Sequence, residues 1–533
     1  MKKRILSLAL AAMMLVTLFT ACSSASSSAP AASSAPASSG SASTSEATSG
    51  GMDTSPITIS IMNRVPAEYI VENNHVLDEI ERITGVRLEV TAPPIANYTD
   101  RMQLAMASGD IPDIIYTWEM DANYEKFAND GLIMPLDKEK LAQYPNLQAN
   151  LNQDQWNRAL VGGMDGEYYA IPRANAQSRW AVIVNQKWLD TLGVEMPTTP
   201  DELYEVAKLI ATEDPDGNGK NDTFLYSPTG LWSDCWLIFS FLPFSLQHRP
   251  AYLPDPYDGE YKIKEKMTGY FPYLDFVRKL YTEGLMDPEW FTNNYYDDRT
   301  KFEQERVGFC HNGSGSEVGY ITTFPDALER FKTYPALLTE GYDKPRNEIA
   351  ASTWGGFMIN ADVDDYKLDR ILSFIDWANS PEGFELFMLG VEGEDYTSYD
   401  IENRSVVRTD EQVEHQTNYI SGYMTFAAAL DGLPATLGST PELAEITKNI
   451  YDEFDAAVDT INIPSLKIPE IDNWAGENPD IASKKEELEV SYVCGKISRE
   501  EYEDFLNNTY FPSIADAEKI YIDTMNAYAA ENS

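Results

Sequence analysis

The stretch of this 533-residue chain with the clearest capacity for chemistry is an acidic loop, DPDGNGKND, at residues 214–222. Its oxygen donors stand at positions 1, 3, 5, 7 and 9 of an EF-hand-like register, the seventh through its backbone carbonyl: Asp214, Asp216, Asn218, Lys220 and Asp222. Calcium prefers six to eight hard oxygen ligands, so this spacing predicts a structural Ca²⁺ site. Position twelve is Leu225 instead of the usual bidentate glutamate, and a solvated turn is the alternative interpretation.

A second set of residues suited to ligand chemistry is aromatic, since the chain holds ten tryptophans and 31 tyrosines. Sugar rings stack their C–H faces on aromatic side chains, and their hydroxyl groups need polar partners. Candidates at expected strand ends, crossings or loops are Trp118, Trp180, Trp232, Trp236 and Trp354. Polar candidates to accompany them are Asn63, Arg64, Glu119, Arg173, Arg179, Asp234, Asn312 and Glu317. A core position is the alternative for each tryptophan, and the arginines leave room for an acidic sugar.

Catalytic patterns are missing from the sequence. The four histidines show no HExxH spacing, and no GxSxG elbow occurs. The 85 acidic residues would allow a carboxylate pair for glycoside hydrolysis, but abundance does not establish one. We therefore assign no catalytic residue.

The elements that must position these side chains begin with a β-α-β pattern. Strands are predicted at residues 57–62, 86–90 and 112–117, with helices at 74–84 and 98–108. Such an order implies parallel strands with right-handed crossovers. Trp118 and Glu119 follow the third strand, at the end of the sheet where open α/β folds bind ligands.

Further along, the chain is expected to pass between two lobes three times. Apolar runs at 168–172 and 180–185 predict strands on either side of a polar hinge at 173–178. A second apolar crossing is predicted at 353–360, returning to the first lobe, and a third between residues 400 and 420. Crossings of this kind are typical of proteins that bend at a hinge.

The N-terminus is typical of a lipoprotein leader. Lys2, Lys3 and Arg4 precede an apolar run, 5–19, and small residues then lead to Cys22, the predicted site of lipidation. Phe19 stands where such motifs usually carry leucine, and an ordinary secretory signal is the alternative. Residues 1–21 are thus the signal peptide, and the Ser/Ala/Gly-rich segment 22–51 is a flexible tether.

The net charge limits the kinds of partner that the protein can bind, and the cysteine content limits the contribution of disulfides to its stability. A formal net charge of −45 disfavours nucleic acid and anionic lipid headgroups. No second run of membrane length occurs, so we expect attachment to the membrane through the lipid alone. The sparse remaining cysteines, Cys235, Cys310 and Cys494, predict free thiols and no disulfide framework, with a Cys235–Cys310 bridge as the alternative.

Several motifs in order resemble the family-one extracellular solute-binding proteins, the lipid-anchored receptors of ABC importers. They are the 163–223 stretch with its strands, capped helix and acidic loop, SGDIPDII at 108–115, YTEGLMDPEWF at 281–291 and GVEGEDY at 390–396. The resemblance implies an α/β, two-lobed periplasmic-binding-protein-like fold (type II) with hinge crossings between the lobes. We expect lobe 1 at 52–174 and 353–410, and lobe 2 at 175–352 and 411–533.

By the same resemblance, the protein is a non-enzymatic monomer on the extracellular face of the membrane. It would capture a carbohydrate, expected to be an oligosaccharide, between its lobes and deliver it to ABC permease subunits. Two alternatives remain: the same fold binding a peptide or another non-sugar solute, and an extracellular glycan-active enzyme.

Overall fold

The computed structural model describes residues 52–118, 120, 122–161, 164, 166–174, 179–231, 235–242, 254–294, 297–338, 342–350, 353–400, 405–427, 441–463, 466 and 468–531. Four predicted site residues, Cys22, Glu119, Trp232 and Asp234, lie outside these ranges. Among the described residues, no helix combines the length and the apolar character needed to cross a membrane.

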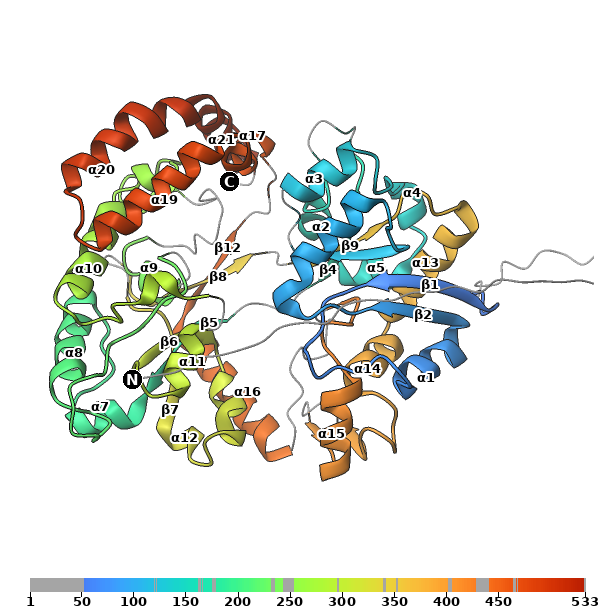
Figure 1. Ribbon diagram of the computed structural model, residues 1–533, viewed down its shortest axis with the longest axis horizontal. Coiled ribbons are helices and arrows are strands. Elements are labelled where there is room, and N and C mark those ends of the chain that lie inside the picture. Colours follow the sequence, from blue (N-terminus) through green and yellow to red (C-terminus); the bar gives the residue numbers. More distant parts are fainter. Residues whose placement is uncertain are drawn as a thin grey trace, which may run out of the picture. The chain divides into compact units, whose positions relative to one another are not determined.

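The first lobe is built on a sheet with the strand order β2-β1-β3-β9-β4 (Figure 1). Its strands are β1 (Ile57–Met62), β2 (Val86–Thr91), β3 (Ile114–Thr117), β9 (Thr353–Ile359) and β4 (Ile171–Ala174). β1 runs parallel to β2 and β3, as the β-α-β pattern predicts, whereas β9 runs antiparallel to β3 and β4. Because β9 pairs with β3, residues 353–359 lie in the same sheet as the N-terminal strands.

Helices cover this sheet. They are α1 (His75–Thr84), α2 (Tyr98–Ser108), α3 (Ala122–Asn129), α4 (Lys138–Leu141), α5 (Pro145–Asn150), α6 (Gln153–Asn157), α13 (Asp365–Ala378), α14 (Pro381–Leu389) and α15 (Asp410–Tyr419), with a short 3₁₀ turn, η1 (Ile95–Asn97). Local signals set their ends: the Asn74 side chain accepts hydrogen bonds from the first N–H groups of α1, and Gly85 ends that helix at φ 70°.

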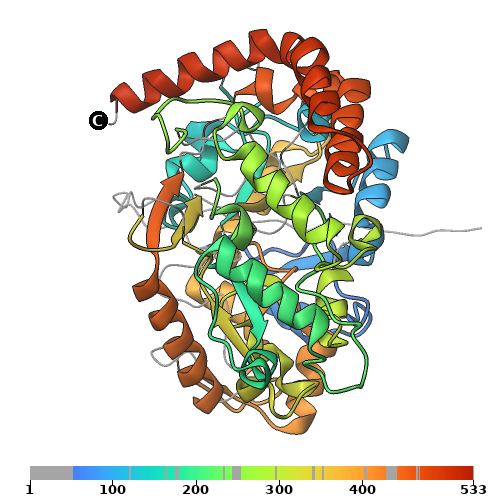
Figure 2. The same cartoon turned by 90° about the vertical axis from the view of Figure 1, so that its left-hand side faces the viewer.

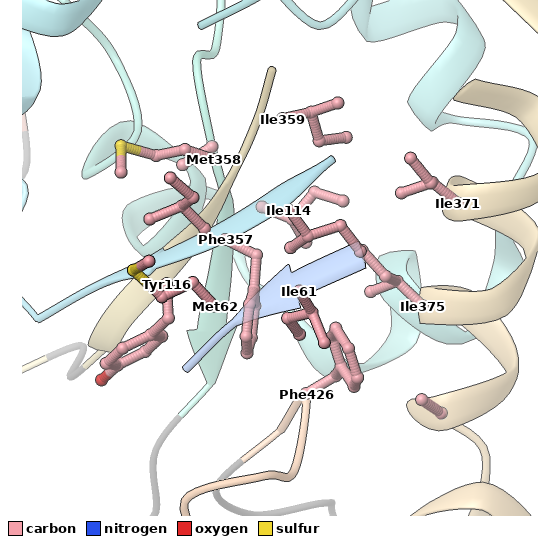
Figure 3. Packing of buried hydrophobic residues seen from close by; sticks show 14 of the residues in the cluster. Ile61, Met62, Ile114, Tyr116, Phe357, Met358, Ile359, Ile371, Ile375 and Phe426 are labelled. Carbon is pink, nitrogen blue, oxygen red and sulfur yellow. The ribbon is translucent and has the colours of Figure 1, made fainter. Parts of the chain in front are cut away.

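The core of lobe 1 lies between the sheet and α13 (Figure 3). Ile61, Ile114 and Phe357 come from three adjacent strands and pack with Ile375 of α13, all fully buried. Phe426 joins them, with its ring centroid 4.5 Å from that of Phe357. This buried face fixes the strand ends that carry candidate site residues.

The lobe boundary predicted after residue 410 is contradicted by this packing. Ile420, Met424 and Phe426 belong to the lobe 1 core, so residues 411–427 are part of lobe 1. They contribute single apolar side chains from an irregular segment, which has no periodic pattern to reveal its lobe. The change of lobe follows residue 427, and residues 428–440 lie outside the described ranges.

The second lobe has its own antiparallel sheet, in the order β6-β5-β7. These strands are β6 (Phe309–Gly313), β5 (Trp180–Asn185) and β7 (Phe331–Tyr334). Associated helices are α7 (Gln186–Leu192), α8 (Pro200–Thr212), α9 (Cys235–Ile238), α10 (Tyr270–Thr282), α11 (Asp297–Glu303) and α12 (Ala327–Arg330), with the 3₁₀ turns η2 (Lys264–Lys266), η3 (Trp290–Thr292) and η4 (Ser316–Thr322). Two further strand pairs are β8 (Arg346–Ala350) with β12 (Asp459–Ile463), and β10 (Ser398–Asp400) with β11 (Ser405–Val407).

Helices from the C-terminal part of the chain complete lobe 2. They are α16 (Pro441–Ala457), α17 (Pro469–Asp472), α18 (Trp474–Glu477), α19 (Pro479–Val493), α20 (Arg499–Phe505) and α21 (Phe511–Glu531), with a π-helical turn, η5 (Leu506–Tyr510), before α21. Figure 2 shows α21 as the long red helix that ends at the C-terminus. Tyr502 and Tyr521 of these helices share one hydrophobic cluster with Trp188 and Tyr273. Cys310 and Cys494 form no disulfide among the described residues, as predicted, while the Cys235 side chain lies outside the described part.

Candidate functional site

Three aromatic rings of lobe 1 form a partly exposed surface, which we call the aromatic platform: Trp118, Trp354 and Tyr423. Trp118 follows β3 and Trp354 lies on the neighbouring strand β9, with ring centroids 5.8 Å apart at an interplanar angle of 43°. Tyr423 is stacked with Trp354 at 6.3 Å and 4°. Trp354 is 38% exposed, which is unusual for so large an apolar side chain. The platform could therefore stack with rings of a ligand.

The backbone around Trp354 holds its ring in place. The Tyr116 hydroxyl donates a hydrogen bond to the Trp354 carbonyl at 2.6 Å. Gly355 follows at φ 69°, and any side chain there would collide with the Thr117 carbonyl. Only glycine allows β9 to approach β3 so closely at this point.

Arg64 and Asn63 lie against the platform. The guanidinium carbon of Arg64 stands 3.3 Å from the Trp118 ring centroid and 4.8 Å from that of Tyr423. Asn63 is fully buried; its Nδ2 donates to the Tyr423 carbonyl at 2.7 Å, and its Oδ1 accepts from the Arg64 N–H at 2.8 Å. Asn63 thus positions Arg64 and Tyr423, and its predicted contact with a ligand stays a prediction.

Arg173 ties β4 to the segment that carries Tyr423. It is 1% exposed; its Nε donates to the Thr425 carbonyl at 2.8 Å and its Nη2 to Thr425 Oγ1 at 2.5 Å. Its guanidinium carbon lies 5.4 Å from the Trp354 ring centroid. Burial lowers the pKa of Arg173, and the positive charge of Arg64 lowers it further. Arg173 is thus a buried support of the platform.

On lobe 2, the partly exposed Trp180 begins β5 and stacks on His311, with ring centroids 5.0 Å apart at 27°. Burial, and secondarily the Arg299 charge, lowers the pKa of His311 to about 3, so this imidazole is neutral at physiological pH. Asn312, next to His311 on β6, is half-buried. Trp180 and Asn312 keep the partial exposure that a ligand contact requires.

Three other predicted residues of lobe 2 are engaged inside the protein. Arg179 donates to both carboxylate oxygens of Asp455, at 2.8 and 2.7 Å. Glu317 is 4% exposed and accepts from the Thr333 N–H at 3.2 Å, and burial raises the pKa of its carboxyl. Trp236 is 1% exposed, with its centroid 5.8 Å from that of Tyr226 in the lobe 2 core.

Trp236 is therefore a correction to the predicted ligand site. Its segment reads as a loop in the sequence because flanking small and polar residues interrupt the apolar pattern, but residues 235–238 form helix α9. That helix packs against β5 and directs the indole ring into the hydrophobic cluster.

The acidic loop follows α8, which begins at the predicted threonine cap, Thr199. Its carboxylates turn toward the loop backbone: the two oxygens of Asp214 accept from the N–H groups of Asn218 and Gly219, at 3.0 and 2.9 Å. The Asn218 amide bridges Asp216 and Asp222, donating at 2.7 and 2.9 Å. The three carboxylates thus all bond to one residue, Asn218, two of them through its side chain and Asp214 through its backbone N–H.

The loop's donors fit a calcium ion. Partial burial raises the pKa of Asp216, and the nearby charges of Asp214 and Asp222 raise it further. A hard cation would neutralise the repulsion between these neighbouring carboxylates. Rotating the Asn218 amide by half a turn would point its oxygen, instead of its NH₂ group, toward the ion. Together with the Lys220 carbonyl, the predicted set offers five oxygen-bearing residues, leaving room for water.

The sequence reasoning missed Tyr423 and a histidine cluster in lobe 1. Tyr423 lies in an irregular segment with no periodicity to mark it. In the cluster, His75 Nε2 lies 2.9 Å and His415 Nδ1 3.4 Å from the fully buried carboxylate of Asp395. Among the described residues, this is the group whose His and carboxylate atoms approach closely enough to hold a metal ion. Asp395 lies in the GVEGEDY motif, but neither histidine has a recognisable spacing from it.

Comparison with known proteins gives one family and several relatives. Residues 73–383 match the family model described as bacterial extracellular solute-binding protein. Lipoprotein LipO of Bacillus subtilis is 26% identical over 347 residues, 62% of this chain and 67% of that protein. The polygalacturonan/rhamnogalacturonan-binding protein YtcQ of the same organism is 25% identical over 350 residues, 64% of this chain and 67% of its own.

Solved structures with the same fold cover most of both chains. The Streptococcus pneumoniae ABC-transporter substrate-binding protein FusA with kestose has a TM-score of 0.66 at 19% identity, over 89% of this chain and 100% of its own. An EF-hand mutant of FusA with fructo-nystose also gives 0.66, at 20% identity and the same coverage. The alginate-binding protein AlgQ2 without calcium ion gives 0.64 at 19% identity, over 89% and 98%. At these identities the likeness shows a shared two-lobed fold.

Proposed function

Because the chain belongs to the bacterial extracellular solute-binding protein family, we propose that it is the receptor of an ABC importer and captures an oligosaccharide. The observation that carries this proposal is the aromatic platform, with Trp354 38% exposed beside Trp118 and Tyr423. Three rings side by side offer stacking positions for more than one sugar unit. FusA with kestose, the polygalacturonan/rhamnogalacturonan-binding protein YtcQ and the alginate-binding protein AlgQ2 support a carbohydrate ligand. They do not decide whether that ligand is neutral or acidic.

In this proposal both lobes contact the sugar. The platform belongs to lobe 1, whereas Trp180 and Asn312 belong to lobe 2. A ligand that touches both groups gains its full set of contacts only when the lobes close, so binding shifts the population toward the closed state. The permease subunits of the importer would recognise that state.

Two further sites, a calcium-binding loop and a lipid anchor, would support the receptor without touching the sugar. Asp214, Asp216, Asn218, Lys220 and Asp222 would hold a structural Ca²⁺ that stiffens the loop after α8. The FusA EF-hand mutant and AlgQ2 without calcium ion, both structural neighbours, support this proposal. Cys22 would carry the lipid anchor on the extracellular face of the membrane, in keeping with the lipoprotein relative. We propose a monomer with no enzymatic activity.

A thermal-shift screen of the protein from residue 23 onward tests this function. The ligands are neutral and acidic oligosaccharides, monosaccharides and peptides, each with calcium and with EDTA. A ligand that binds only the folded state raises the melting temperature. We expect a selective rise with one family of oligosaccharides, whereas a rise with peptides alone would replace the carbohydrate by a peptide ligand.

A further inference from the structure

Resting on the proposed function, we propose that the oligosaccharide is acidic and that a carboxylate of its sugar, as in a hexuronate, binds Arg64 beside the platform. Two arginines are buried here against the stacking rings, and no carboxylate of the described residues forms an ion pair with either of them.

Arg64 is buried, and its side chain contacts ring faces but no polar partner among the described residues. It is 8% exposed, and its Nε is a buried atom with no hydrogen-bond acceptor. No hydrogen bond or ion pair of its guanidinium is found among the described residues, and the only hydrogen bond at Arg64 comes from its backbone N–H. A buried cation without hydrogen bonds is costly, so the folded chain keeps an unsatisfied donor group at this place.

Arg173 adds a second positive charge next to the first. Its guanidinium donates to the Thr425 carbonyl and hydroxyl, which are neutral acceptors, and it forms no ion pair with a described carboxylate. The charge is therefore held in place but not neutralised. Arg173 is thus a positioning residue, and the electrostatic field of its positive charge adds to that of Arg64.

Among the described residues, the lack of a carboxylate partner for these two arginines is not explained by a shortage of acidic residues. The chain has 85 acidic and 40 basic residues, and cations elsewhere are paired: Arg179 with Asp455, Lys301 with Asp287 and Arg330 with Glu305. Instead, the Arg64 guanidinium is supported by the ring faces of Trp118 and Tyr423. Cation–π contacts stabilise the charge while leaving its N–H groups free for an anion.

The geometry favours a carboxylate carried on a sugar ring. A guanidinium presents parallel N–H donors that match the two oxygens of a carboxylate. Because Arg64 lies on the same rings that would stack with the sugar, one hexuronate unit could contact the platform and the arginine together. A neutral sugar would satisfy the donors with hydroxyl groups but would leave both charges without a counter-charge.

Titration calorimetry with matched pairs of ligands tests this inference. The probes are trisaccharides of galacturonate, of guluronate and of glucuronate, each beside its methyl ester, which keeps the ring and removes the charge; neutral gluco- and fructo-trisaccharides complete the panel. The proteins are the wild type, Arg64→Gln, Arg64→Lys, and Arg82→Gln on the exposed face of α1 as a control. Unchanged circular dichroism and melting temperature establish that the variants fold.

We expect one of the acids to bind and its ester to bind more weakly. Arg64→Gln should lower the affinity for the acid roughly ten- to hundredfold and barely change that for the ester, because a hydrogen-bonded charge pair is lost. Arg64→Lys should give an intermediate value, and Arg82→Gln no change. Binding of neutral sugars without binding of any acid, or equal losses for acid and ester, would overturn this inference alone. No binding of any sugar would overturn the proposed function with it.

Discussion

Trp354 is 38% exposed and stands on the aromatic platform, whereas Trp236 is 1% exposed and lies in the lobe 2 core. The same side chain therefore has two different roles in this protein. On the platform an indole offers a face to a ligand, and in the core it contributes buried apolar area to stability. Removing each ring should separate binding from folding.

We predict that Trp354→Ala weakens binding of the oligosaccharide at least about tenfold, equivalent to about 1.4 kcal/mol, and leaves the melting temperature nearly unchanged. The comparison variant Trp236→Ala should destabilise the fold by roughly 3–5 kcal/mol because it opens a cavity in the core. Titration calorimetry and chemical denaturation measure the two effects. Equal affinities of Trp354→Ala and the wild type would remove this ring from the site.

A second prediction at the residue scale concerns acid stability. The folded-state pKa of His311 is lowered to about 3 from 6.5 by burial, so the unfolded chain binds a proton at this residue that the folded chain does not. The stability that neutral His311 contributes is present above pH 6.5 and is lost as the pH falls toward 3. His311→Phe keeps a ring beside Trp180 and cannot titrate.

His311→Phe should therefore lose less stability than the wild type between pH 7.5 and pH 5, by on the order of 1–2 kcal/mol. Denaturant titrations at the two pH values measure this difference. If the two proteins lost the same stability on acidification, His311 would not be the buried neutral group that the structure shows.

At the scale of elements, the sequence predicts the bounds of helices and strands where it carries a strong local pattern. The predicted bounds of β1, α2 and β5 agree with those observed, since each element combines a periodic apolar pattern with a clear stop signal. Residues 411–427 were assigned to the wrong lobe, because single apolar side chains such as Phe426 give no periodic signal. The same holds for the candidate site. Trp118 and Trp354 lie at strand ends, which the sequence predicts, and the structure brings their rings together. Tyr423 lies in an irregular segment that the sequence does not single out, and Trp236 is buried in the core.

The acidic loop gives the prediction at this scale. Calcium should raise the melting temperature and EDTA should reverse the rise; at a hundredfold excess over its Kd, the ion would add about 2.7 kcal/mol. Asp216→Asn should abolish the response because it removes a charged oxygen ligand from the loop. Glu205→Gln, on the exposed side of α8, is the matched control and should respond like the wild type. A wild-type melting temperature equal in calcium and EDTA would show that the loop is only a solvated turn.

At the scale of the whole molecule, the chain builds two lobes, each with its own sheet and its own hydrophobic cluster. β4 and β9 belong to one sheet and β5 to the other, so the chain changes sheet between residues 174 and 180. Which sugar the molecule takes depends on side-chain geometry that arises only when distant segments meet. Arg64, Arg173 and Tyr423 come from three such segments, so no local pattern could have placed them together.

The central claim is that the protein holds a carbohydrate without changing it. The most direct measurement is titration calorimetry of the protein with the oligosaccharide family found in the thermal-shift screen, followed by chromatography of the recovered sugar. We predict saturable binding of one sugar per protein, with the sugar recovered intact. Binding of peptides but of no sugar, or recovery of shortened sugar fragments, would contradict the claim.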